Sequence, residues 1–116
     1  MLTNERVGGV IITADSLFFS LRRRIAETAL ENRVPTIFLQ REYVEAGGLM
    51  SYGERLADLY RRSAFYVDKI FKGAKPAELP IQQPTKFYTT INRKTAEALM
   101  LSIPLQLLVL SDEVIE

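Results

Sequence analysis

The chain has 116 residues, of which 47% are hydrophobic and 25% charged, and this is the composition of one folded domain of ordinary size. Its formal net charge is +1, so its overall charge offers no general attraction to nucleic acid or to anionic lipid. Cysteine and histidine are both absent, which excludes disulfides, thiolate metal sites and the commonest general base. We therefore expect no nucleic-acid partner, no metal site and no cofactor.

No apolar run approaches the ~20 residues that a helix needs to cross a bilayer. The polar segment from Met1 to Arg6 lacks the apolar stretch of a secretory signal. We expect neither membrane insertion nor a signal sequence in this chain.

Residues 7–39 have the pattern of a strand, a helix and a second strand. Val7–Thr13 is short, apolar and rich in β-branched residues, as in a buried strand. From Leu17 to about Arg33, apolar residues recur every three or four positions, which predicts an amphipathic helix that Pro35 ends. Thr36–Leu39 has the composition of a second buried strand, and the three elements together predict a βαβ unit with a parallel sheet.

The next segment predicts a third strand and a second long helix. Gln40–Gly48 is a polar connection with about one helical turn, and Leu49–Tyr52 is a short strand. A second amphipathic helix is expected over about Glu54–Lys72, and Gly73 follows in the position that favours left-handed backbone.

The last third begins with a proline-rich tract, residues 74–84, which we expect to be extended and without regular structure. Lys86–Ile91 alternates as a fourth strand, and Asn92 is placed to cap a short helix that ends near Met100. The tail is strongly apolar around Leu105–Leu110. The whole chain, residues 1–116, is thus predicted to be a single α/β domain: a mostly parallel sheet flanked by helices in three layers.

Polar residues follow each of the first three predicted strands. Ligands gather outside the carboxyl ends of the strands of an open parallel sheet, where helix N-termini also point. The candidate ligand-binding residues are Asp15, Ser16, Glu42, Ser51, Tyr52 and Gly53. Carboxylates and a hydroxyl, beside free N–H groups and an aromatic face, suit an amino-acid-like ligand.

Structural roles for the same residues stay open. Asp15 or Ser16 can serve simply as a helix N-cap, Glu42 as a solvated loop residue, and Tyr52 as packing beneath a loop. An enzyme would need a matched acid and base, and Asp15 with Glu42 is the one convergent pair of carboxylates that we can propose. Because nothing indicates an activated nucleophile, we expect a binding protein without catalytic residues.

Five stretches of the sequence form a longer pattern: DSLFF at 15–19, REYVEAGGLMSYG at 41–53, LADLYRRSAFYVDKIFKGAKPAELPIQQPTKF at 56–87, INRKTAEAL at 91–99 and DEVIE at 112–116. Together they resemble the C-terminal part of ABC-transporter substrate-binding proteins of the type I periplasmic-binding fold, most of all the tryptophan- and tyrosine-binding branch. The resemblance covers nearly the whole chain in order. One departure is Met100, where such sequences usually have glycine.

The resemblance implies one lobe of a periplasmic or extracellular, lipid-anchored receptor that closes two lobes around a small molecule and docks on an ABC permease. It places ligand contacts on the same six residues, from Asp15 to Gly53. Family members also carry an N-terminal lobe and a signal sequence, neither of which we find in these 116 residues. The alternative is a stand-alone ligand-sensing or protein-interaction domain that forms a homodimer through the exposed edge.

Overall fold

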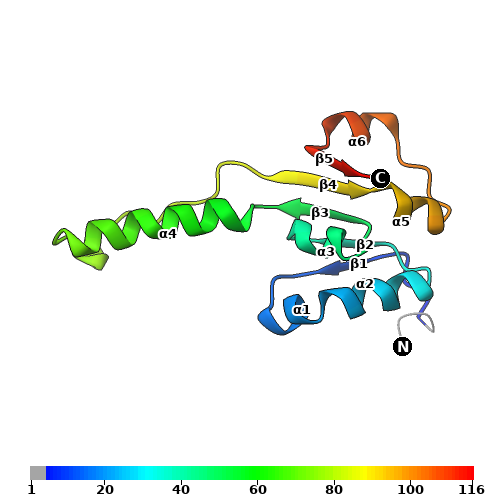
Figure 1. Cartoon of the computed structure of the whole chain (residues 1–116), viewed down its shortest axis with the longest axis horizontal. Coiled ribbons are helices and arrows are strands. Elements are labelled where there is room, and N and C mark those ends of the chain that lie inside the picture. Colours follow the sequence, from blue (N-terminus) through cyan, green and yellow to red (C-terminus); the bar gives the residue numbers. More distant parts are fainter. Residues whose placement is uncertain (1–4) are drawn as a thin grey trace.

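The computed structural model describes residues 5–116, which form one sheet with short helices around it and a long helix that projects away (Figure 1). The elements in chain order are β1 (Val10–Ile12), α1 (Ser16–Ser20), α2 (Arg22–Glu31), β2 (Thr36–Phe38), α3 (Arg41–Glu45), β3 (Met50–Gly53), α4 (Leu56–Phe71), the 3-10 helix η1 (Pro76–Glu78), β4 (Tyr88–Asn92), α5 (Arg93–Ala98), α6 (Leu105–Leu110) and β5 (Glu113–Ile115).

The five strands form a single sheet in the order β1-β2-β3-β4-β5. β1, β2 and β3 are mutually parallel, β4 runs antiparallel to β3, and β5 is parallel to β4. The predicted class, a mostly parallel α/β fold, is confirmed.

The first predicted helix is interrupted at Leu21, which separates α1 from α2. Leu21 has φ −95° and ψ 9°, and its N–H is shared between the carbonyls of Leu17 and Phe18. Arg22 donates to the carbonyl of Phe19 at 2.9 Å and lies over the Phe19 ring, which satisfies the end of α1. Apolar periodicity continues through the break, so it does not reveal the interruption.

The core lies between the sheet and α3. Phe38 and Tyr43 are fully buried and stack with ring centroids 4.5 Å apart, and Phe19 meets Tyr43 edge to face. A Cβ at Gly48 would overlap the Phe38 ring, so that position admits no side chain. A smaller cluster of Leu49, Ala96 and Leu99 packs at the amino end of β3.

β1 was predicted to be a buried strand, and this is wrong for the described chain. Ile11 is 73% exposed, because β1 is the edge of the sheet and nothing within residues 5–116 covers its outward face. β2 fits the prediction better, since Thr36 and Phe38 are both buried.

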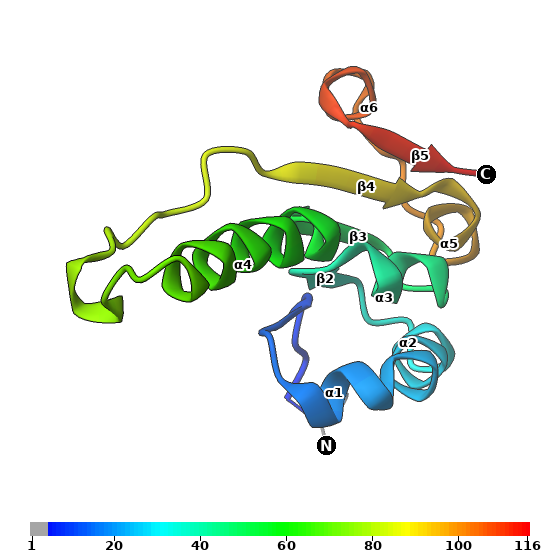
Figure 2. The ribbon, with the colours of Figure 1, turned by 60° about the vertical axis from the view of Figure 1, so that its left-hand side comes forward.

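The long helix α4 projects beyond the sheet, as Figures 1 and 2 both show. No residue of α4 is buried by the rest of the described chain. The radius of gyration is 17.4 Å, whereas a compact chain of this length would have about 13 Å. The molecule is therefore elongated, with extents of 55 × 33 × 20 Å.

The tail contains two elements that the sequence did not predict. The apolar run after Pro104 forms α6, and residues 113–115 add β5 to the sheet beside β4. None of the helices in the described part of the chain is both long enough and apolar enough to span a membrane.

Candidate functional site

The parallel run of β1, β2 and β3 brings all six candidate residues to one end of the sheet. Asp15 and Ser16 follow β1, Glu42 lies in α3 just after β2, and residues 51–53 form the end of β3. The side chains do not share one surface, however. They form three groups, one after each strand: Asp15 with Ser16, then Glu42, then residues 51–53.

Asp15 and Ser16 begin α1 and are both exposed. Asp15 Oδ1 accepts the backbone N–H groups of Leu17 and Phe18 at 2.8 and 3.2 Å, which is an N-cap. The capping role that the sequence left open for Asp15 is confirmed, and it fixes the orientation of the carboxylate at the sheet edge.

Glu42 is half-buried in the first turn of α3 and borders two polar depressions. One, of about 410 Å³, is shared with Ser20 and with the arginines at the start of α2, Arg22 and Arg23. The other, of about 460 Å³, lies between Arg41, Arg55 and the acidic pair at 112–113. Glu42 therefore stands among arginine side chains on both sides.

One wall of the second depression is fixed by Arg41. Its guanidinium makes two bonds to the Glu113 carboxylate, at 2.7 and 3.0 Å, and a further ion pair to Glu45 at 2.9 Å. The hydrogen bond with Glu113, aided by the surrounding carboxylates, raises the pKa of Arg41 above its ordinary value. This fork ties β5 to α3 and keeps Arg41 charged.

Ser51 and Tyr52 point to opposite sides of the sheet. Ser51 is 2% exposed and shares a face with Phe38, whereas Tyr52 is 51% exposed on the other face. Tyr52 stacks on Phe87 with centroids 5.5 Å apart, so the two rings form an open aromatic surface at the end of β3.

Gly53 is required by the close approach of two chain segments. A Cβ at this position would overlap the backbone carbonyl of Leu39, which follows β2. The glycine therefore allows the ends of β2 and β3 to meet tightly.

Tyr43 lies beneath the α1 end of this edge, and its hydroxyl finds no hydrogen-bond partner within residues 5–116. Burial, and after it the charge of Asp15, raises the pKa of Tyr43, while Arg22 acts in the opposite direction. The edge-to-face contact with Phe19 places the Tyr43 ring against α1.

Phe87 and Arg55 are the site residues that sequence reasoning missed. The antiparallel register sets Tyr88 opposite Gly53 and so brings Phe87 beside Tyr52. Arg55 lies 3.9 Å from the centroid of the Tyr88 ring. The alternation of residues 86–91 is a signal for the strand, but it does not reveal which strand is the partner.

The described residues contain no cluster of three or more acidic side chains that could hold a metal ion. The edge is instead a surface of carboxylates, arginines, hydroxyls and exposed aromatic rings. Such a surface can bind a small zwitterionic or aromatic molecule by charge pairing and stacking.

The fold over nearly the whole chain is shared with parts of larger proteins of known structure. The chain superposes on a conserved domain protein of Vibrio cholerae O1 biovar El Tor with a TM-score of 0.90 at 24% identity, covering 97% of this chain and 38% of that one. It superposes on the ABC domain from Streptococcus pneumoniae in complex with L-Trp with a TM-score of 0.89 at 25% identity, covering 98% and 39%.

The family model of ABC transporter substrate binding proteins matches residues 2–115, so the chain belongs to that family.

A ligand-free, open structure of a substrate-binding protein with adhesive properties from Clostridium difficile shows the same fold with a TM-score of 0.62 at 20% identity. The match covers 98% of this chain and 39% of that one. No curated protein matches significantly. The chain thus spans about two-fifths of the length of these relatives.

Proposed function

We propose that this chain supplies the C-terminal part of the solute-binding component of an ABC-type importer, with an amino acid or a similar small molecule bound at the carboxyl edge of its sheet. Membership of the substrate-binding family over residues 2–115 carries this proposal. The family is typically non-enzymatic, and it typically works in the periplasm or outside the cell. In its full-length context the protein would hand its ligand to an ABC permease.

The surface chemistry supports an amino-acid ligand with a planar side chain. The open Tyr52–Phe87 pair offers a stacking face, and L-Trp is the ligand in the Streptococcus pneumoniae relative. The carboxylates of Asp15 and Glu42 suit an ammonium group, and Ser16 adds an exposed hydroxyl. Ser51 and Gly53 contribute through backbone shape, since one is buried and the other has no side chain.

A binding site that is only partly formed holds its ligand weakly. A ligand pocket normally buries most of the surface of its ligand, and an open edge buries much less. We therefore expect millimolar affinity for the chain alone, equivalent to about −4 kcal/mol.

Saturation-transfer NMR with L-tryptophan tests the proposal, because it detects weak ligands directly. Tyr52→Ala should abolish most of the signal, since it removes the stacking face. Tyr60→Ala is the matched control, because Tyr60 is a 70% exposed tyrosine on α4, outside the six candidate residues. Transfer that both variants retain equally would contradict a site at Tyr52, and the absence of transfer in the unsubstituted chain would contradict tryptophan-like ligands.

A further inference from the structure

Phe87 supplies half of the open aromatic surface at the end of β3, yet no strand pairing holds it. The last pair in the β3–β4 register is Gly53 with Tyr88, so Phe87 lies one residue outside the ladder. Residues 81–87 make no backbone hydrogen bond within the described chain, and six of these seven residues are exposed. The stacking of Phe87 on Tyr52 therefore depends on how the chain is anchored at Tyr88.

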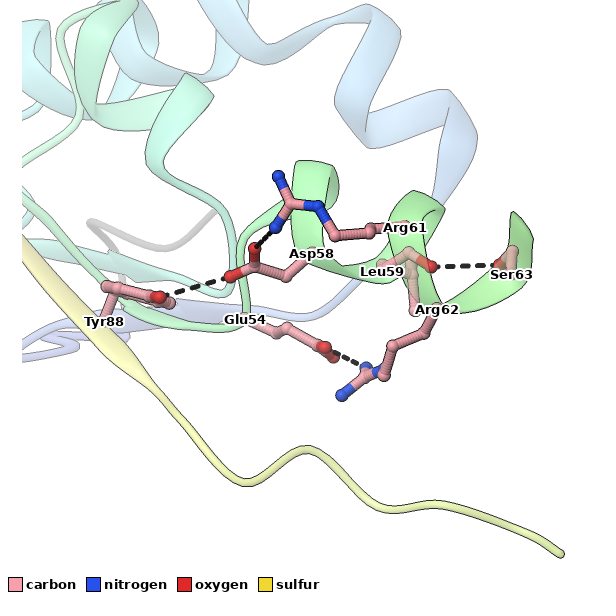
Figure 3. A network of polar contacts seen from close by, with 7 residues as sticks. All are labelled: Glu54, Asp58, Leu59, Arg61, Arg62, Ser63 and Tyr88. Atoms are coloured by element: carbon pink, nitrogen blue, oxygen red, sulfur yellow. Dashed lines mark hydrogen bonds and ion pairs between the residues drawn. The ribbon is translucent and has the colours of Figure 1, made fainter. Parts of the chain in front are cut away.

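Three side chains anchor the ring of Tyr88. The guanidinium of Arg55 lies 3.9 Å from the ring centroid and the ammonium of Lys86 lies 4.6 Å from it, so both cations contact the aromatic face. The Tyr88 hydroxyl donates to Oδ2 of Asp58 at 3.2 Å (Figure 3). We call these four residues the Tyr88 clamp. It joins the segment that leaves β3, the first turn of α4 and the segment that enters β4.

The acceptor in this clamp is itself held in place by α4. Oδ1 of Asp58 accepts from Arg61 at 3.0 Å, and Arg61 lies about one turn further along the helix. Glu54 pairs with Arg62 beside them, as Figure 3 shows, and this ion pair ties the connection after β3 to the same helix. The Asp58 carboxylate is therefore already oriented, so little side-chain freedom is lost when it accepts the Tyr88 hydroxyl.

We propose that Tyr88 is a positioning residue for the aromatic surface: by fixing the chain at the start of β4, the Tyr88 clamp holds Phe87 against Tyr52. Tyr52 does not need the clamp, because it lies inside the ladder opposite Thr89. Release of the clamp would therefore free Phe87 alone. The consequence for ligand binding rests on the proposed function, since a planar ligand gains more stacking area from two rings than from one.

The first test needs no ligand. Nuclear Overhauser cross-peaks between the rings of Tyr52 and Phe87 report the surface, and those between Phe38 and Tyr43, which stack in the core, report the overall fold. Tyr88→Ala should abolish the first set and keep the second. Tyr88→Phe should weaken the first set, because the loss of one hydrogen bond shifts the balance between held and released Phe87 by about two- to tenfold.

Asp58 supplies the conservative comparison. Asp58→Asn keeps an acceptor oxygen for the Tyr88 hydroxyl and should preserve the surface cross-peaks, whereas Asp58→Ala should weaken them as much as Tyr88→Phe does. Because the two side chains act through one bond, the double variant should show no greater loss than either single variant.

Tyr66→Phe is the matched control. It also removes a tyrosine hydroxyl, which donates to the carbonyl of Pro80 at 2.6 Å on the same returning chain but away from the clamp. This variant should leave the surface cross-peaks unchanged.

Saturation transfer to L-tryptophan then tests the link to binding. The transferred signal should fall most in Tyr88→Ala, less in Tyr88→Phe and not at all in Tyr66→Phe. A chain without any transfer, but with surface cross-peaks that depend on Tyr88, would support the clamp and contradict a tryptophan-like ligand, so the two failures can be told apart.

Four results would overturn the proposal. They are surface cross-peaks that persist in Tyr88→Ala, an equal loss in Tyr66→Phe, core cross-peaks that disappear in Tyr88→Phe, and ligand transfer that stays unchanged when the surface cross-peaks are lost. If Tyr88→Ala does not fold, Tyr88→Phe and Asp58→Ala decide the question.

Discussion

Among residues 5–116, four helices end in a residue with positive φ, and two of these four residues are glycine. After α3 and α4 the residue with positive φ is Gly47 or Gly73, whereas after α2 and α5 it is Arg33 at φ 54° or Met100 at φ 57°. At the end of α5, Met100 donates to the carbonyl of Glu97 and Leu101 to that of Ala96, which is the Schellman pattern of hydrogen bonds. Met100→Gly should therefore stabilise the protein.

The magnitude follows from two opposing effects. A residue other than glycine loses about 1–2 kcal/mol in the left-handed region, because its Cβ approaches the following carbonyl oxygen. Glycine gives the unfolded chain more freedom, which offsets about 0.5–1 kcal/mol of that gain. Met100 is 76% exposed, so little packing is lost. We expect a net gain of about 0.5–1 kcal/mol in the free energy of unfolding.

Urea denaturation followed by far-UV circular dichroism measures this change directly. Gly73→Met is the reverse control: a Cβ there would meet nothing within 4 Å, so only the backbone conformation, at φ 102°, opposes it. It should lower the free energy of unfolding. If Met100→Gly leaves the protein equally or less stable, the reasoning from left-handed strain is refuted.

Three further predictions concern the site end of the sheet. Asp15→Ala should lower the free energy of unfolding by about 1 kcal/mol through loss of the N-cap, and Asp15→Asn should largely preserve it; equal losses in urea titrations would exclude the capping role. Gly53→Ala should cost about 1–3 kcal/mol, because the new methyl group meets the carbonyl of Leu39, and a melting temperature equal to that of the unsubstituted protein would contradict this close contact. Because burial, and then Asp15, raises the pKa of Tyr43, the unfolded chain ionises this tyrosine first, and stability should fall as the pH rises above about 10. Tyr43→Phe should reduce this fall, and an unchanged pH profile between pH 9 and 11 would argue against a buried neutral hydroxyl.

The βαβ start of the fold could be predicted because its signals are local. The apolar run before Thr13, the cap at Asp15 and the stop at Pro35 each constrain a few residues, and all three agree. Non-local pairing could not be predicted in this way. The β4 strand follows α4 and residues 72–87 and lies antiparallel to β3, and β5 depends on pairing with β4.

The candidate site, too, could be predicted only where it depends on local sequence. Strand ends are local, so the end of the sheet at which Asp15, Glu42 and Tyr52 gather follows from the βαβ pattern. The side chains beside them depend on register. Ser51 faces the core and Phe87 joins Tyr52 only because β3 and β4 pair as they do.

The prediction that β1 is buried failed for a reason other than strand pairing or register. Its apolar composition indicates a buried strand, yet Ile11 is exposed because β1 is the edge strand and nothing within residues 5–116 covers that face of it. Tyr60 and Phe71 on α4 show the same mismatch, since they are apolar side chains that the described residues leave exposed.

The most direct test of the central claim, a solute site at the carboxyl edge of this sheet, is an amide-resolved NMR titration of the chain with aromatic and branched-chain amino acids. The account predicts saturable shifts that cluster at residues 15–16, 42 and 51–53 for at least one ligand. Shifts spread along α4, or none at tens of millimolar ligand, would contradict a site at this edge.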